Sequence, residues 1–253
     1  MSAKRSGRLL FCAATAAELA AILPPESASL LSGGPGSLWK CGTDYLLVSG
    51  VGRASAALSL GAALARLGNE VRGVVQVGFA GAYRCARTRE WIAGARAVRV
   101  VSETEPECGA AVPGGILALE ELGLGKTKWI SGHAPDALPE PFAGLGLEAL
   151  PAARGATVDC STGSLARGAE RRARAGGAEV ESLEGSALFE AAERFALPAV
   201  EIRAVTNLCA KRDRAAWKTA EAAVNLRKIF AARFRSRPRP AGSVFGPAAG
   251  GAR

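Results

Sequence analysis

The chain has 253 residues, of which 49% are hydrophobic and 22% charged. A chain of this length and composition buries about 75% of its unfolded surface, which excludes an intrinsically disordered protein and fits one domain or at most two. The formal net charge is +9, but seven of the 32 basic residues follow Glu221, the last acidic residue, so the preceding part carries only +2 and shows no basic preference for nucleic acid.

Apolar strand-like runs alternate with alanine-rich helical stretches, a pattern typical of an α/β domain with a largely parallel sheet. We expect strands at 8–14, 45–50, 73–78, 95–103, 155–160, 177–182 and 199–207. We expect helices at about 15–23, 52–68, 163–175, 183–196 and 213–234. Residues 104–154 are rich in glycine, proline and charge, and we expect long loops there with one short helix around Ile116–Leu122.

Both ends of the chain carry basic residues. Near the N-terminus they precede an apolar run that resembles a short signal peptide, but Glu18 interrupts this run, and we interpret it as a buried strand entering a helix. No run approaches the roughly 20 apolar residues of a membrane span, so we expect a cytoplasmic protein with no membrane partner. Residues 235–253 are rich in Arg, Pro and Gly, and we expect a disordered tail after one domain at 1–234.

Cysteine and histidine usage bears on metal sites and disulfides. The six cysteines form no CxxC pair, and His133 is the only histidine. This usage supports neither a zinc site nor a disulfide framework. A Ser/His/Asp triad would have to use His133, which lies in a loop flanked by Gly and Pro and is expected to be a surface residue.

Two glycine turns follow apolar strands, at Gly50–Gly52 and Gly78–Gly81. Neither a complete P-loop nor a GxGxxG dinucleotide motif is present, because Glu120 and Ser55 stand where those motifs need glycine. Such turns let backbone N–H groups approach a ligand at the carboxyl ends of parallel strands. Tight strand–helix connections also use glycine for packing alone, and the sequence leaves both interpretations open.

Three polar residues are expected at strand ends, with a fourth inside a strand. Glu18 follows the first strand, Glu184 begins a helix and Asn207 closes the last strand. Glu184 could accept hydroxyl hydrogen bonds or could simply complement the helix dipole, and Asn207 could be a turn residue. Arg203 lies in a strand apolar enough to be buried, so it requires an acidic partner, and Glu18 or Glu184 is the expected one.

Five motifs carry a resemblance to a known family. SGVGRASAAL, QVGFAGAY, TVDCSTGS, VESLEGSALF and IRAVTNLCAKRDRAAW resemble the purine nucleoside phosphorylase and nucleosidase superfamily over about residues 8–230. Within it they are most similar to the futalosine hydrolase family of menaquinone biosynthesis. The resemblance implies a single three-layer α/β domain with a central mixed sheet. It also implies a homo-oligomer that cleaves the N-glycosidic bond of a small nucleoside, without a metal or organic cofactor.

The resemblance also implies roles for particular residues. Glu18 falls where nucleosidases keep the carboxylate that activates water, Glu184 where a Glu binds the ribose hydroxyls, and Asn207 at the purine-contacting position. Arg203 would orient the carboxylates and hold Glu18 ionised. The remaining substrate-binding positions line the ribose and nucleophile side or pack under the sugar: Gly78, Phe79, Ala80, Gly81 and Leu183.

Base preference and reaction type follow from the same positions. Hypoxanthine presents two acceptors, N7 and O6, to a protein, whereas adenine presents N7 and an amino donor. The amide of Asn207 can donate to acceptors, so it points to a 6-oxopurine such as that of futalosine, with release of hypoxanthine. A methylthioadenosine or S-adenosylhomocysteine type of nucleosidase stays an alternative. A second alternative is a phosphorylase that binds phosphate through Arg53, although Phe79 lacks the hydroxyl expected at its position. A third alternative is nucleic-acid binding through the Arg-rich tail.

Overall fold

The computed structural model describes residues 8–22, 29–32, 36–131 and 138–234. The strands are β1 (Leu9–Ala13), β2 (Ser29–Ser32), β3 (Leu38–Cys41), β4 (Asp44–Val48), β5 (Gly73–Ala82), β6 (Ala97–Thr104), β7 (Gly109–Val112), β8 (Gly115–Ala118), β9 (Lys128–Ile130), β10 (Ala152–Thr157), β11 (Val180–Ser182) and β12 (Ala199–Leu208). The α-helices are α1 (Ala16–Ile22), α2 (Arg53–Leu67), α3 (Thr88–Ala93), α4 (Leu165–Arg174), α5 (Gly185–Arg194) and α6 (Thr219–Phe234). Short 3₁₀ turns occur at Gly68–Glu70, Glu140–Phe142, Leu147–Ala149 and Arg214–Ala216.

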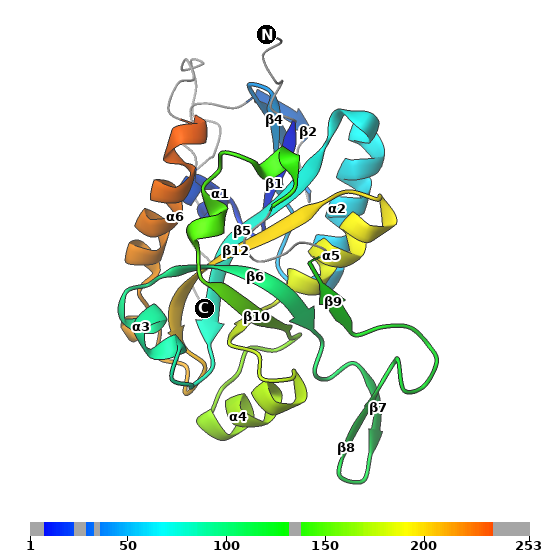
Figure 1. Ribbon diagram of the computed structural model, residues 1–253, viewed down its shortest axis with the longest axis vertical. Coiled ribbons are helices and arrows are strands. Elements are labelled where there is room, and N and C mark those ends of the chain that lie inside the picture. Colours follow the sequence, from blue (N-terminus) through cyan, green and yellow to red (C-terminus); the bar gives the residue numbers. More distant parts are fainter. Residues whose placement is uncertain (1–7, 23–28, 33–35, 132–137, 235–253) are drawn as a thin grey trace.

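A central sheet runs through the molecule in the order β11-β10-β6-β12-β5-β1-β4-β3-β2, with β9 paired to β6 (Figure 1). Its middle strands β4, β1, β5 and β12 are parallel, whereas β6 is antiparallel to β12. The expected central mixed sheet is therefore confirmed. Because parallel strands end at the same edge, the residues after β1 and at the ends of β5 and β12 lie close together.

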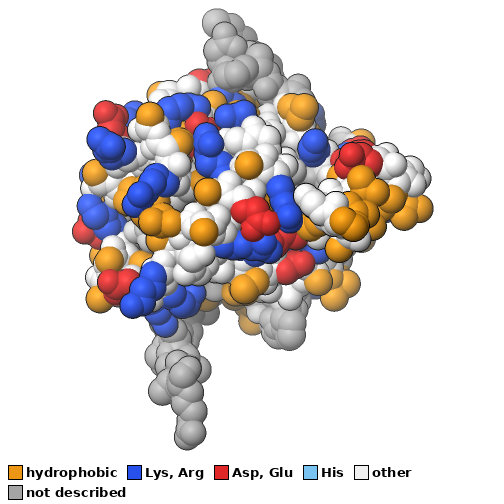
Figure 2. All heavy atoms as spheres, turned by 90° about the horizontal axis from the view of Figure 1, so that it is seen from below, with side chains coloured by type: hydrophobic (Ala, Val, Ile, Leu, Met, Phe, Trp, Pro, Cys, Tyr) orange, Lys and Arg blue, Asp and Glu red, His pale blue; other side chains and the backbone are white. Residues whose placement is uncertain are grey.

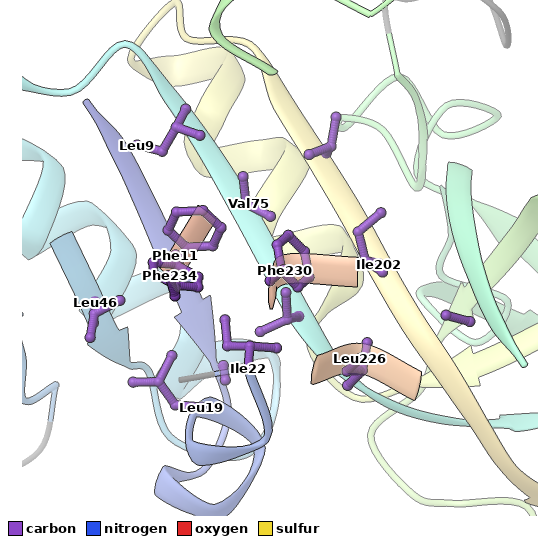
Figure 3. Packing of buried hydrophobic residues seen from close by; sticks show 14 of the residues in the cluster. Leu9, Phe11, Leu19, Ile22, Leu46, Val75, Ile202, Leu226, Phe230 and Phe234 are labelled. Carbon is purple, nitrogen blue, oxygen red and sulfur yellow. The ribbon is translucent and has the colours of Figure 1, made fainter. Parts of the chain in front are cut away.

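One face of the sheet is covered by α1 and α6. Alternate residues of a strand point to opposite faces, and Leu9 and Phe11 of β1 point toward these helices. The Phe11 ring meets the rings of Phe230 and Phe234 edge to face, with centroids 5.7 and 5.1 Å apart. Figure 3 shows these aromatic side chains gathered over β1 and β5. This packing attaches the C-terminal helix to the strand that leads into Glu18.

The other face of the sheet packs against α2 and α5. Leu10 and Cys12, the intervening residues of β1, belong to a second buried cluster with Leu60 and Leu64 of α2 and Leu188 of α5. The two clusters make the three layers, helices–sheet–helices, that alternating strands and helices predict. Within the described residues no helix is both long and apolar enough to span a membrane.

The segment 104–154 differs most from the expectation. The short helix predicted around Ile116–Leu122 is wrong, because β7 and β8 form a hairpin that projects from the body (Figure 1). Pro113 and Gly114 make its two-residue turn, with Gly114 at φ 90°, a backbone conformation that glycine adopts without strain. The residues after Ala118 form turns, and β9 then adds to the sheet beside β6.

Other boundaries also move. Strands β2 and β3 and helix α3 were not expected, since their few apolar residues show no clear period. The helix predicted at 213–234 begins only at Thr219, because the Asp213 side chain accepts a hydrogen bond from Ala215 N and caps a separate 3₁₀ turn. The segment 235–253 and His133 lie outside the described residues.

Candidate active site

A cavity of about 410 Å³ lies at the carboxyl ends of β1, β5, β11 and β12. Seven of the nine predicted site residues line it: Glu18, Phe79, Ala80, Gly81, Leu183, Glu184 and Asn207. The other two, Gly78 and Arg203, lie beneath the cavity in β5 and β12. The structure therefore brings together residues that are up to 189 positions apart in the chain, at the edge where the parallel strands end.

Glu18 is held at the start of α1 by a reciprocal cap. The Glu18 carboxylate accepts hydrogen bonds from Thr15 N at 3.0 Å and Thr15 Oγ1 at 2.9 Å, and Glu18 N donates to Thr15 Oγ1. This is the capping box that the spacing Thr-x-x-Glu favours. The other oxygen, Glu18 Oε1, accepts from Phe79 N at 2.9 Å. The carboxylate is thereby fixed between the end of β1 and the second glycine turn.

Burial and Arg203 act on the Glu18 carboxylate in opposite directions. Arg203 lowers the pKa of Glu18, in the direction that we expected, but burial raises this pKa above its ordinary value. The Arg203 charge, the Phe79 N–H and Thr15 act in the opposite direction without cancelling the effect of burial. Since only 8% of Glu18 is exposed, removal from water is the dominant cause.

Glu184 is the N-cap residue of α5 and reaches across to the first glycine turn. Its Oε1 accepts a hydrogen bond from Gly52 N at 3.0 Å, and its Oε2 lies 3.4 Å from Arg203 Nη1. Gly50 and Gly52 have φ of 87° and 91°, a region that favours glycine. The first glycine turn therefore presents a backbone N–H to a carboxylate of the site.

Gly78 leaves room for the charged groups beneath the cavity. A Cβ at this position would lie 2.5 Å from Arg203 Nη1 and 2.8 Å from Glu18 Oε1. Arg203 is 1% exposed and donates from Nε to Glu201 Oε1 at 2.7 Å. The expected ion pair of Arg203 with Glu184 is therefore present, at 3.4 Å, and Glu201 is a closer partner that was not expected.

Asn207 lies at the end of β12, where a bulge shifts the register with β5. The Thr206 hydroxyl donates to Asn207 Oδ1 at 2.7 Å, and Asn207 Nδ2 donates to the Leu208 carbonyl at 3.0 Å. An amide nitrogen carries two N–H groups, so a second donor remains for a ligand in the cavity. Asn207 can therefore still offer an N–H to a ligand.

Several residues around the cavity were missed from the sequence. Thr15 could have been found from its capping-box spacing, and Glu201 from its place two residues before Arg203 on the same strand face. Trp217 and the segment 161–163 also line the cavity, and the signal for them was their place in the motifs IRAVTNLCAKRDRAAW and TVDCSTGS. Within the described residues no group of three or more His, Cys, Asp or Glu side chains could hold a metal ion.

Arg53, the residue on which the phosphorylase alternative rests, forms ion pairs within the protein. Its guanidinium forms ion pairs with Glu105 and, at 3.0 Å, with Asp159. These contacts tie the start of α2 to the segments that follow β6 and β10. An arginine with two carboxylate partners has little positive charge left for a phosphate.

Comparison with known proteins gives several relatives of one kind. The chain is 32% identical to futalosine hydrolase of Thermus thermophilus over 184 residues, 72% of this chain and 77% of that protein. It is 34% identical to futalosine hydrolase of Acidothermus cellulolyticus over 193 residues, 75% of both chains. A 38% identical match to futalosine hydrolase of Streptomyces coelicolor covers 121 residues, 47% of this chain and about half, 48%, of that protein. No family model matches the chain.

Solved structures agree on the architecture. A futalosine hydrolase mutant of Helicobacter pylori superposes with a TM-score of 0.71 at 14% identity, covering 88% of this chain and 96% of that one. The MTA/SAH nucleosidase of Streptococcus pneumoniae gives a TM-score of 0.67 at 18% identity over the same shares. At such identities these likenesses concern the fold alone, which is that of the nucleoside phosphorylases. Together with relatives above 30% identity over about three quarters of its length, they place the chain in the futalosine hydrolase family.

Proposed function

We propose that this protein hydrolyses the N-glycosidic bond of futalosine, releasing hypoxanthine and dehypoxanthine futalosine, in menaquinone biosynthesis. The observation that carries the proposal is the placement of Glu18, Glu184 and Asn207 on the wall of one cavity, with the two carboxylates close to the single guanidinium of Arg203. Membership of the futalosine hydrolase family supports the substrate.

Glu18 is the proposed general base. Cleavage of a nucleoside proceeds through a ribosyl cation that is attacked by water, so the site needs a carboxylate that can take the water proton. Two backbone N–H groups and the Thr15 hydroxyl hold the Glu18 carboxylate in one orientation. Its raised pKa makes the carboxylate a stronger base than an exposed glutamate.

Glu184 and Asn207 are proposed to bind the two halves of the nucleoside. The Glu184 carboxylate can accept hydrogen bonds from the ribose hydroxyls and stabilise positive charge that develops on the sugar. Asn207 can donate its remaining N–H to an acceptor of the departing purine. Leu183 and Phe79 complete the cavity with apolar surface, and Gly78 allows Glu18 and Arg203 to approach the ribose side.

Water is favoured over phosphate as the nucleophile. A phosphorylase needs hydroxyl and basic groups around the anion, yet Phe79 occupies the second position of the glycine turn, and Arg53 is paired with Glu105 and Asp159. Lys211 and Arg212 line the cavity as well, but both follow Asn207 along the chain, on the side proposed for the base.

The decisive experiment is incubation of the protein with futalosine, inosine and methylthioadenosine, each with and without phosphate, followed by chromatography of the released base. We expect hypoxanthine from futalosine at the same rate in both buffers. Preferential adenine release from methylthioadenosine would instead support the related nucleosidase, and a requirement for phosphate would support a phosphorylase. No release from any nucleoside would contradict the proposal.

We also propose that the protein acts as a homo-oligomer. The hairpin β7–β8 and the residues after it project from the body, and Figure 2 shows hydrophobic side chains gathered on this projection at the right of the view. Exposed hydrophobic residues there are Val112, Leu117 and Leu124, and Ile130 at the end of β9 is exposed as well. Apolar surface of this kind is typical of protein interfaces. Light scattering after gel filtration tests the assembly, and cell fractionation tests the predicted cytoplasmic location.

A further inference from the structure

Two buried carboxyls lie behind the cavity and are not needed for the steps above. Glu103 in β6 is 1% exposed and Glu201 in β12 is fully buried. Glu201 Oε1 accepts from Arg203 Nε at 2.7 Å, and Glu103 Oε2 accepts from Thr157 Oγ1 at 2.7 Å. The second oxygens, Glu103 Oε1 and Glu201 Oε2, receive no hydrogen bond from any donor that the structure describes.

The two carboxyls are direct neighbours. Burial raises the pKa of Glu103 well above its usual range, and the charge of Glu201 raises it further. Because Glu201 already accepts a hydrogen bond from the Arg203 guanidinium, the negative charge is better stabilised on Glu201, and the proton belongs to Glu103. A proton between these carboxyls gives each of them the partner that its second oxygen lacks.

The charges around Arg203 also require a neutral carboxyl. The titratable groups that face Arg203 from the surrounding elements are Cys12 of β1, Glu18 of α1, Glu184 at the start of α5, Glu201 of β12 and, behind Glu201, Glu103 of β6. Burial raises the pKa of the Cys12 thiol, which stays neutral. One guanidinium would therefore face four buried carboxylates if all were ionised, and each uncompensated buried charge is costly.

Glu103 is also packed against the backbone that carries Glu184. A Cβ at Gly185 would lie 2.4 Å from Glu103 Oε1, and one at Gly155 would lie 2.0 Å from the same oxygen. Thr157 Oγ1, the donor to Glu103, accepts a hydrogen bond from Ser186 N at 2.8 Å. Glu103 and Thr157 thereby hold the first turn of α5 in place.

We propose that Glu103 and Glu201 hold one proton between them and that the single negative charge of this pair, acting through Arg203, controls the ionisation of Glu18 and the position of Glu184. Both are positioning residues, since neither lines the cavity. The link to Glu18 rests on the proposed function, whereas the shared proton does not depend on it.

The first test compares pH profiles of kcat/KM for futalosine. In E103Q the amide N–H replaces the carboxyl O–H as donor to Glu201, so the acidic limb of the profile stays in place. In E103Q/E201Q the negative charge is gone, Arg203 stabilises the Glu18 carboxylate more strongly, and the limb moves about one pH unit lower. The matched control is E179Q, because Glu179 is also buried but is paired with Arg87 and not with Arg203. In E179Q the acidic limb should stay in place.

A displaced limb in E103Q alone, an unmoved limb in the double variant, or an equal displacement in E179Q would each overturn the proposal. If the double variant does not fold, a second measurement tests the shared proton without it and without substrate. In the E18Q background, where Glu18 cannot contribute, the infrared spectrum at neutral pH should show the carbonyl band of a buried neutral carboxylic acid. The added E103Q substitution should abolish this band.

The two hypotheses fail differently. If no nucleoside is cleaved while the infrared band behaves as expected, the function is wrong and the shared proton stands. If futalosine is cleaved but the band is absent in E18Q, the shared proton is refuted and the proposed function stands.

Discussion

At the scale of single residues, the two carboxylates of the cavity have different surroundings. Glu18 is bound by Thr15 and Phe79 N, and Glu184 by Gly52 N and Arg203. Glu18 combines a fixed orientation with a pKa raised by burial. This combination supports the proposal that Glu18 transfers the proton while Glu184 binds the sugar.

Substitution of each carboxylate by its amide separates these roles. E18Q should lower kcat by about 100-fold or more with little change in substrate binding, because the base is lost. E184Q should lower kcat/KM by a similar factor and raise KM, because contacts with the ribose hydroxyls weaken in both ground and transition states. Steady-state kinetics with futalosine measures both, with exposed Glu148→Gln as the control. Near-normal kcat in E18Q would rule out Glu18 as the base.

The pH dependence follows from the raised pKa of Glu18. The active form is the ionised carboxylate, so kcat/KM should fall as the pH drops through a value above the ordinary range for glutamate, and should be flat above it. The measurement is a pH–rate profile with a stability control at each pH. An acidic limb at or below the pKa of an exposed glutamate would show that burial does not control this group.

Base preference depends on residue 207. Asn207 keeps an N–H that can donate to an acceptor of the ligand, which favours a 6-oxopurine. N207D should shift the ratio of kcat/KM toward the 6-amino analogue of futalosine by about 1–3 kcal/mol. The control is N69D, an exposed position in a 3₁₀ turn. An unchanged ratio in N207D would remove this residue from base recognition.

At the scale of elements, α6 depends on a few aromatic contacts for its place on the sheet. Phe230 is fully buried and its ring meets that of Phe11, the strand residue that precedes Cys12 and the site (Figure 3). F230A should lower the free energy of unfolding by about 3–5 kcal/mol, because it leaves a cavity between helix and sheet. Val224 is exposed on the same helix, so V224A should change the free energy of unfolding by no more than about 0.5 kcal/mol. Urea denaturation compares them, and equal losses would contradict this packing argument.

At the scale of the whole molecule, the basic excess of the chain is confined to its C-terminal part. Residues 235–253 contain no acidic residue and no apolar period, so we propose that the nucleosidase domain spans residues 1–234. A variant that ends after Phe234 should keep the Tm and the hydrolysis rate of the full chain. A large fall in Tm would show that the segment docks on the domain. A gel shift at low and high salt tests nucleic-acid binding by the full chain.

The sequence alone determined the order of the main strands and helices and seven of the residues that line the cavity. The continuous apolar run of β1 and the 3.6-residue apolar period of α5 are patterns within short segments, so the sequence alone shows them. The motif around Asn207 indicated the family for the same reason. Glycine and proline in 104–154 signalled irregular structure, but Pro113 and Gly114 also had to be recognised as a hairpin turn.

Only the tertiary structure decided which distant charges meet. Glu201 shares a strand face with Arg203 two residues away, which is a local relation, whereas Glu184 meets Arg203 from the start of α5, 19 residues away in the chain. The pKa of Glu18 is raised because its surroundings come from α1, β5, β12 and α5, and desolvation depends on all of them at once. Glu103 meets Glu201 because β6 pairs with β12, across nearly 100 residues of chain. Such contacts depend on strand register and depth of burial, which no local period of the sequence encodes.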